Sequence, residues 1–430
     1  MTAVVGILNK QAVAIAADSA VTIGGSNGNK IFNRANKVFT LSKYHPVGIM
    51  IYNSASLLST PWETIIKMYR KQLGKNSFPR VEDYKIDFIR YLNSKSYFTD
   101  EHTQKTFIEF FFKSTCDMLV NESLSENRDL FNNLTLENKA EIVRLIDLKM
   151  DETIATLSTR TDLCQELEEI TLEEFKEFTL IQFQHNIDTI FIHNDYILTP
   201  EFQQKLLNLF YLVFRIQESY NNFTGLIFVG FGEEEIYPQL LPLNISLVFK
   251  DKLRYYDDVG NSGKISPFND GAICPFAQTD VINTILTGVD PILDNTYHEN
   301  LKETLIKYNS LILDELGDTN EELSEKLRNL DFNILTSEYE TKIKDTKMLN
   351  YIQPLMNAVS SLSKEDLAEM AESLIYLTYL KRRITFAEES VGGPVDVAII
   401  SKGDGFIWIK RKHYFKPELN RYFFDNYFNT

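Results

Sequence analysis

The first fifty residues alternate apolar and small or polar side chains over short stretches separated by turn residues. Residues 3–8 and 12–17 are rich in Val, Ile and Ala and flank a polar turn, and residues 37–41 and 47–52 form a similar pair. Alternation with a period of two is typical of β-strands with one face toward a core. The pattern predicts a hairpin at the start of the chain, then a loop marked by Gly24, Gly25 and Gly28, and then a second pair of strands.

A helical pattern follows. Thr60, Pro61 and Glu63 have the order of an N-cap, a first helical residue and a capping-box partner, and Gly74 is suited to ending the helix. From there to about residue 220, Leu, Ile and Phe recur at intervals of three and four, and glycines are few. This region is expected to be an inserted set of helices.

Strand-like stretches return later in the chain. Residues 225–232 and 244–258 are rich in β-branched and aromatic side chains, and a helix is predicted to begin near Thr279. A second charged helical stretch covers roughly residues 294–350. Strands therefore resume between two helical regions.

The end of the chain closes with a helix and a hairpin. Ser363 is a predicted N-cap, and the apolar side chains after it recur on one helical face, which we expect to lie on a sheet. Residues 395–400 and 406–411 are the last predicted strands, joined by a turn that contains an Asp-Gly pair.

The predicted organisation is one core interrupted by two insertions. In chain order it comprises a first part of the core (1–75), a helical insertion (76–222), a continuation of the core (223–293), a second helical insertion (294–350) and a core closure (351–430). At 430 residues the chain is long enough for such an enlarged domain.

Composition and charge exclude several functional classes. Apolar residues make up 44% of the chain and charged residues 24%, as in ordinary globular proteins. The 60 acidic residues exceed the 44 basic ones and give a net charge of -16, which repels nucleic-acid backbones. No apolar run is long enough for a membrane span, and no signal peptide is evident. We therefore expect neither nucleic acid nor membrane as a partner.

The sequence also offers no metal or cofactor motif. Its three cysteines (Cys116, Cys164 and Cys274) have no CxxC spacing, and its six histidines are dispersed. No Gly-rich phosphate loop is present, so any dependence on ATP would come from a separate ATPase or regulator. These features are expected of a cytoplasmic protein without a cofactor.

Three segments carry candidate chemistry. The first, TAVVGILNKQAVAIAADSAVTIGG, contains Thr2, Asp18, Ser19 and Thr22. The second, NKVFTLSKYHPVGIM, contains Lys37, and Lys30 lies shortly before it. The third, ITFAEESVGGPVDVAIISKGDGFIWI, contains a Gly-Gly pair, Gly392 and Gly393, before the final hairpin.

Together these segments resemble the proteasome beta subunits and their bacterial homologues, which are N-terminal-nucleophile (Ntn) hydrolases. The resemblance covers both ends of the chain and, more weakly, its middle strands; the helical insertions have no counterpart. It implies an α+β fold, a four-layer αββα sandwich of two antiparallel sheets with inserted helical regions.

The resemblance also implies the roles of the site residues. Thr2, exposed once Met1 is removed, is expected to be the nucleophile, with its own amine as the base. Because no leader precedes Met1 in this sequence, we expect no self-cleavage. Lys37 would keep that amine neutral and Asp18 would hold the lysine in place, with Lys30 as a competitor for Lys37. Glu388 occupies the position of the family's Asp before the Gly-Gly pair.

Substrate contacts are implied at two further places. Thr22 matches the family's Thr after the Asp-Ser pair. At the oxyanion position the family has a Gly-Gly pair and this chain has Tyr52 and Asn53; we expect the Tyr52 backbone N–H to serve.

Several positions depart from the family. Val391 stands where a Ser is usual, and Ala277 aligns with another supporting Ser, although Thr279 is two residues away. Taken singly, Asp18 could simply end a strand and Lys37 could lie on the surface.

Three functions therefore stay open. The leading one is a threonine-type amidohydrolase, a proteasome-like peptidase. The others are an amidase acting on a small-molecule amide and an inactive proteasome-like scaffold or regulatory subunit. The resemblance further implies a peptide or protein substrate and assembly into a homo-oligomer.

Overall fold

The structure is a computed structural model that describes residues 2–25, 28–95, 99–125, 129–130, 134–218, 223–316, 321–385, 391–413 and 415–422. It is a mixed α+β fold with antiparallel sheets. Contacts within the chain divide it into two compact units. Unit 1 comprises residues 1–35, 236–238 and 263–430, and unit 2 comprises residues 36–235 and 239–262.

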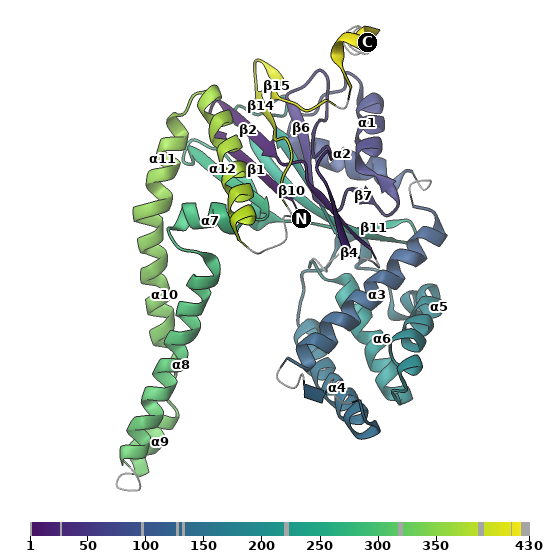
Figure 1. The fold of residues 1–430 in the computed structure, drawn as a ribbon, viewed down its shortest axis with the longest axis vertical. Coiled ribbons are helices and arrows are strands. Elements are labelled where there is room, and N and C mark those ends of the chain that lie inside the picture. Colours follow the sequence, from purple (N-terminus) through teal and green to yellow (C-terminus); the bar gives the residue numbers. More distant parts are fainter. Residues whose placement is uncertain are drawn as a thin grey trace. The chain divides into compact units, whose positions relative to one another are not determined.

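The sheet of unit 1 has five strands in the order β13-β1-β2-β14-β15. These are Gly271–Ala277, Ala3–Asn9, Ala12–Ala17, Asp396–Ser401 and Gly405–Lys410, respectively. Because β14 pairs antiparallel with β2, the two ends of the chain contribute neighbouring strands to one sheet (Figure 1). The predicted N-terminal and C-terminal hairpins are both confirmed.

Helices cover one face of this sheet. They are α7 (Asp280–Thr287), α11 (Gln353–Ser361) and α12 (Lys364–Ile384). Alternate residues of β1 and β2 pack on the buried face of α12, in a cluster that includes Ala3, Val5, Ile7, Ala14, Ala16, Leu367, Ala371, Leu374 and Ile375. The Ser363 hydroxyl accepts from the Asp366 N–H and caps α12, as its sequence predicts.

Unit 1 also contains a helical arm, defined here as α8 (Pro291–Leu316), α9 (Glu321–Arg328) and α10 (Asn333–Lys347). Figure 1 shows α8 and α10 side by side, with α9 at the far end of the arm. Helix α10 continues through a π-helical turn, η7 (Met348–Ile352), into α11. No described side chain of α8 or α10 is fully buried.

The sheet of unit 2 has the order β11-β10-β9-β6-β5. Its strands are Lys252–Asp257, Gln239–Phe249, Thr224–Gly230, Val47–Asn53 and Val38–Thr40, respectively. Helices α1 (Trp62–Leu73) and α2 (Val81–Asn93) pack on one face, where Ile49, Ile51, Trp62, Phe88, Leu226 and Phe228 share a core. The second predicted pair of strands, β5 and β6, is confirmed.

A second core of unit 2 lies among α3 (Glu101–Ser123), α4 (Leu136–Ser158), α5 (Leu172–Ile190) and α6 (Pro200–Arg215). Its centre is aromatic: the rings of Phe112 and Phe210 stack with centroids 4.4 Å apart and an interplanar angle of 13°. The shorter elements of the chain are β3 (Val21–Gly25), β4 (Gly28–Phe32), β7 (Ser56–Leu57), β8 (Thr60–Pro61), η3 (Gln165–Leu167), η4 (Ile192–Asn194), η5 (Val259–Asn261), β12 (Gly263–Lys264) and η8 (Pro417–Leu419).

Two local predictions were wrong. The glycine-rich segment after Val21, expected to be a loop, forms the paired strands β3 and β4. The first helix begins at Trp62, without a side-chain cap, because Thr60 and Pro61 instead pair with β7 as strand β8. Gly74 ends that helix with a positive φ of 55°, as predicted. Among the described residues, no helix is long and apolar enough to cross a membrane.

Candidate active site

The Asp18 carboxylate joins three separate stretches of backbone in unit 1. Its Oδ1 accepts from the Ala3 N–H, and its Oδ2 accepts from the N–H groups of Ala20 and Gly392, each at 3.0 Å. The side chain is 1% exposed. A buried carboxylate needs such donors, since burying a charge without hydrogen bonds is costly. The residue is therefore fixed in orientation directly beside the start of β1.

The Gly392–Gly393 pair lies beside Asp18 and contacts its neighbour Ser19. The Ser19 N–H donates to the Gly392 carbonyl at 3.0 Å, and the Ser19 hydroxyl donates to the Pro394 carbonyl at 2.5 Å. Gly393 has a φ of 77°, and a Cβ there would lie 2.7 Å from the Asn33 carbonyl oxygen. Only glycine meets both conditions without strain. The segments found from the sequence, around Asp18 and before β14, are thus in direct contact.

Thr2 precedes β1 and is 3% exposed. Its carbonyl accepts from the Gln278 N–H at 3.2 Å, which extends the pairing of β1 with β13 by one residue. The Gln278 side chain accepts from the Arg382 guanidinium, which also donates to Asp280 at 2.5 Å. Gln278 and Arg382 were not found from the sequence, because nothing in the residues around them marks their proximity to Thr2.

Lys37 belongs to unit 2, where its carbonyl accepts from the Ile51 N–H at 2.9 Å. Its side chain is 3% exposed, whereas its competitor Lys30 is exposed and lies over the Phe32 ring. The surface position considered for Lys37 is therefore excluded. Its contact with Thr2 and Asp18, which belong to unit 1, stays a prediction.

Tyr52 and Asn53 end strand β6. Because the Ile51 N–H is directed toward β5, strand alternation directs the Tyr52 N–H toward β9, where Gly225 is its partner. By the same alternation, the Asn53 N–H is on the β5 side of β6, two residues past the Ile51 N–H that bonds to Lys37. Asn53 has a positive φ of 67°, a conformation that glycine usually supplies.

The Tyr52 side chain is in a packed, buried environment. Its hydroxyl donates to Asn244 Oδ1 at 3.1 Å, and a Cβ at Gly225 would lie within 1.8 Å of the ring. Burial raises the pKa of the Tyr52 hydroxyl well above its usual value, with a smaller contribution from Asp258. The phenol therefore stays protonated and does not act as a base near neutral pH.

The remaining candidates are placed only in part. Thr22 lies in β3 opposite Ile31, and its side chain lies outside the described residues, as does the whole of Glu388. Val391 is 1% exposed and packs in the core beneath the unit 1 sheet, so it takes a purely apolar role. Ala277 ends β13 with a positive φ of 66°, and Thr279 precedes α7.

Comparison with known proteins gives little independent information. No family model matches the chain, and no curated protein matches it. Among solved structures, the chain is similar to that of the Anbu (Gly-1) mutant from Hyphomicrobium sp. strain MC1, with 10% sequence identity over 99% of this chain and 95% of that one, and a TM-score of 0.26. Since this score is far below the value expected of a shared fold, we base no conclusion on it.

Proposed function

We propose that the chain is a threonine-type Ntn amidohydrolase, a proteasome-like peptidase in which Thr2 is the nucleophile once Met1 has been removed. The observation that carries this proposal is the set of backbone hydrogen bonds accepted by the Asp18 carboxylate. The buried Asp18 carboxylate accepts from the N–H of Ala3, the residue after Thr2, and from the N–H of Gly392, which lies 374 positions after Asp18 in the chain. The two segments that carry the resemblance, one near each end of the chain, are thereby in contact.

The proposed chemistry follows from the residue types. The Thr2 amine would take the proton of the Thr2 hydroxyl, whose oxygen attacks the amide carbon of the substrate. The amine then passes this proton to the leaving nitrogen, and water hydrolyses the resulting ester. Lys37 would disfavour protonation of the amine by charge repulsion, with Asp18 as its counter-charge. The burial of Lys37 supports this role, since a buried ammonium requires a negatively charged or polar partner.

We place the oxyanion donor at the Asn53 N–H rather than at Tyr52. The Tyr52 N–H is directed into the sheet toward β9, whereas that of Asn53 is directed beyond the paired part of β5. A left-handed residue at this point gives the backbone the turn that a glycine would give. Thr22 and Glu388 keep their proposed supporting roles.

The four-layer αββα sandwich is the finer fold that we propose. In its support, β1 and β2 are buried at every position, although helices α11 and α12 cover only one of their faces. In unit 2, Met50, Ile227 and Val229 are buried on the sheet face opposite α1 and α2. Each sheet thus has a buried apolar face that its own helices do not cover, as the inner sheets of a four-layer fold require.

An inactive scaffold or regulatory subunit is the second candidate. It is favoured by Val391, whose side chain belongs to the core, so that no hydroxyl is available at that position. In either case we propose a homo-oligomer, with a separate ATPase or regulator supplying any energy-dependent step.

Two measurements test the proposal. Intact-mass spectrometry of protein purified from its own host should show a chain that begins at Thr2. Cleavage of a panel of fluorogenic peptides should fall by about 100-fold or more in Thr2→Ala and should be retained in part in Thr2→Ser.

A matched pair of lysine variants tests the alignment. Lys37→Ala should abolish cleavage, whereas Lys30→Ala should leave it within about twofold, because Lys30 is exposed. Retained Met1, or a wild type that cleaves no peptide, would leave the scaffold function as the explanation. Cleavage unaffected by Thr2→Ala would exclude Thr2 as the nucleophile.

A further inference from the structure

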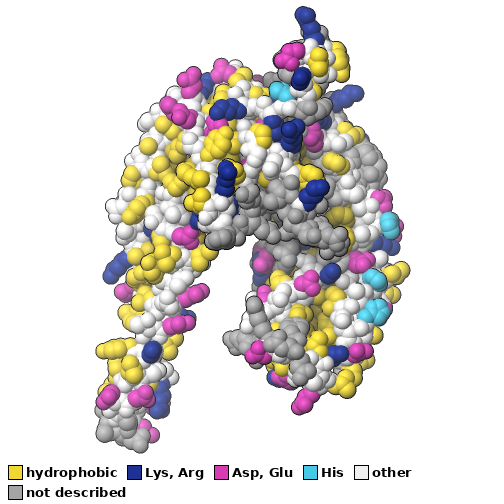
Figure 2. Space-filling view, viewed as in Figure 1, with side chains coloured by type: hydrophobic (Ala, Val, Ile, Leu, Met, Phe, Trp, Pro, Cys, Tyr) yellow, Lys and Arg dark blue, Asp and Glu magenta, His cyan; other side chains and the backbone are white. Residues whose placement is uncertain are grey.

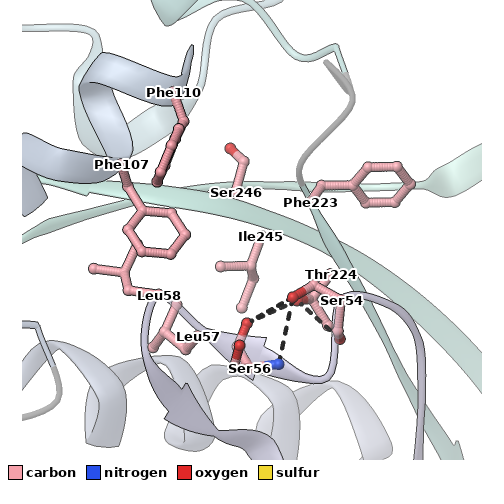
Figure 3. Close-up of a pocket in the computed structure, with 10 residues that line it drawn as sticks. All are labelled: Ser54, Ser56, Leu57, Leu58, Phe107, Phe110, Phe223, Thr224, Ile245 and Ser246. Atoms are coloured by element: carbon pink, nitrogen blue, oxygen red, sulfur yellow. Dashed lines mark hydrogen bonds between the residues drawn. The ribbon is translucent and has the colours of Figure 1, made fainter. Parts of the chain in front are cut away.

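A cavity of about 290 Å³ lies wholly within unit 2, and its lining includes Ser54, the residue after Asn53. Figure 3 shows its lining, which has an apolar part and a hydroxyl-rich part. The apolar side chains are those of Leu57, Leu58, Phe107, Phe110 and Ile245, whereas the Phe223 ring points away from them. The hydroxyls of Ser54, Ser56 and Thr224 lie together, and Ser246 lies apart from them, on the side of Phe107 and Phe110. Ligand sites combine an apolar wall with a few fixed polar groups in this way.

A β-bulge in β10 brings Ser246 to the cavity wall. Ile245 pairs with Tyr255 and Leu247 with Arg254, so Ser246 is the extra residue. In a regular strand, neighbouring side chains point to opposite faces; here Ile245 and Ser246 both line the cavity. Bulges redirect side chains in this manner and are frequent beside functional sites.

The Ser246 hydroxyl, at the cavity wall, has its proton available for donation. Its oxygen accepts from the Arg254 guanidinium at 2.7 Å, which leaves its single proton to donate elsewhere. A narrower hollow next to the cavity shares Phe107, Phe110 and Ser246 and is lined by Arg254. The positive charge behind the hydroxyl strengthens its donation and favours a ligand oxygen with partial negative charge.

The hydroxyls of Thr224 and Ser54 already have hydrogen-bond partners. Thr224 accepts from the Trp62 indole N–H at 2.9 Å and is directed at the Ser54 carbonyl at 3.3 Å, and Ser54 donates to the Ser56 carbonyl at 3.0 Å. These bonds hold the segment after β6 in place, with Leu58 in a left-handed conformation (φ 51°) at the cavity wall. A branched residue keeps such a conformation only where its surroundings impose it.

We infer that this cavity binds a small ligand with an aromatic or branched aliphatic body and an amide carbonyl, with the carbonyl accepting from Ser246. Such a group is found on an apolar residue of a peptide and on a small acyl amide. The volume, at the lower end of the range for ligand pockets, admits one such group. The helix that supplies Phe107 and Phe110 is α3, which lies in the region that the sequence marked as an insertion.

The test uses the full chain carrying Thr2→Ala, so that no probe is hydrolysed and the outcome is independent of catalysis. N-acetyl-L-phenylalaninamide represents the peptide source, and 3-phenylpropanamide represents the small acyl amide. Ethylbenzene has the aromatic body of these ligands but no carbonyl. Ligand-observed NMR titration should give saturable binding of at least one amide, with a Kd between about 0.1 and 5 mM for ligands of this size. The amide that binds more tightly identifies the source.

Two variants locate the binding. Phe110→Ala should weaken amide binding at least about fivefold, because half of this side chain is already exposed and its loss removes a wall with little effect on the fold. Phe268→Ala, at a phenylalanine that is 98% exposed and outside the cavity, is the matched control and should change the Kd less than twofold.

The donor is tested by Ser246→Ala, in which Arg254 keeps its bonds to the Phe214 and Ile216 carbonyls. This change should remove the preference for an amide over ethylbenzene. Absence of saturable amide binding at about 5 mM, equal loss in Phe110→Ala and Phe268→Ala, or an amide preference unchanged in Ser246→Ala would each overturn the inference.

Discussion

The helices of unit 2 between residues 101 and 215 and the arm of unit 1 have the same kind of sequence pattern but different interiors. Both are charged helical segments with recurring Leu, Ile and aromatic residues. In unit 2, α3 to α6 enclose their own core, in which Phe112, Phe175, Phe210 and Phe214 are fully buried. In the arm, the described side chains of α8 and α10 are all at least partly exposed, and Figure 2 shows hydrophobic side chains on its surface.

The difference lies in how many helices share an apolar face. Four helices can surround a core, so each of them buries a stripe of side chains. Two helices bury only the seam between them, and their other apolar residues, such as Tyr308 and Leu311, stay exposed. Stability is therefore concentrated in unit 2 and in the sheet of unit 1, while the arm depends on short-range helical contacts.

The largest expected effect tests this contrast with one substitution type. Leu206→Ala in α6, at a side chain that is 0% exposed, should lower the free energy of unfolding by about 2–5 kcal/mol. Leu311→Ala in α8, at a side chain that is 55% exposed, should lower it by about 0.5 kcal/mol or less. Urea unfolding followed by circular dichroism compares the two. Equal losses would show that the arm is buried in the native protein.

A second comparison, within unit 1, is between the buried carboxylate of Asp18 and an exposed carboxylate of the arm. Asp18→Ala leaves three buried N–H groups without their acceptor and should cost about 2–4 kcal/mol. Glu299→Ala, at an exposed carboxylate of α8, should change the free energy of unfolding by no more than about 0.5 kcal/mol. If Asp18→Ala unfolds no more easily than Glu299→Ala in urea, the hydrogen bonds of Asp18 do not stabilise the fold.

The glycine pair gives a smaller, local comparison. Gly393→Ala combines a left-handed backbone with a contact of 2.7 Å to the Asn33 carbonyl and should cost about 1–3 kcal/mol. At Gly392 the nearest atom to an added Cβ is a Tyr379 ring carbon at 3.5 Å, an ordinary contact, so Gly392→Ala should cost less than about 1 kcal/mol. Thermal unfolding of both variants measures the difference, and a reversed order would contradict the backbone argument.

The smallest effect concerns the base of the arm. Asp290 accepts from Lys381 and from the Ile292 N–H, each at 3.0 Å, and the Lys381 hydrogen bond lowers the pKa of this carboxyl below its usual value. Because the folded-state pKa is the lower one, the contribution to stability is present above about pH 3.9, the unfolded value, and is lost as the pH falls through the folded value. The urea midpoint of Asp290→Asn should therefore lie below that of the wild type at pH 7, and the two should converge in acid. A difference that persists in acid would exclude the ion pair as its cause.

Much of the fold is predictable because its signals are local. The N-terminal and C-terminal hairpins, strands β5 and β6 and the Ser363 cap all follow from alternation, turn residues and capping groups within a few positions of one another. The start of α1 is not predicted correctly, because the pairing of β8 with β7 outweighs the capping signal at Thr60.

The candidate site likewise has some features that the sequence indicates and others that only the tertiary structure shows. The sequence by itself marked Thr2, Asp18 and the Gly392–Gly393 pair as a set, through the resemblance of the segments that contain them to a known family. Only the tertiary structure decided that Asp18 reaches the Gly392 N–H, that Val391 belongs to the core and that Gln278 contacts Thr2. It alone also placed Phe107 beside Ser246 in one cavity. These contacts join residues far apart in the chain, and their geometry depends on sheet register and packing, which no short sequence pattern specifies.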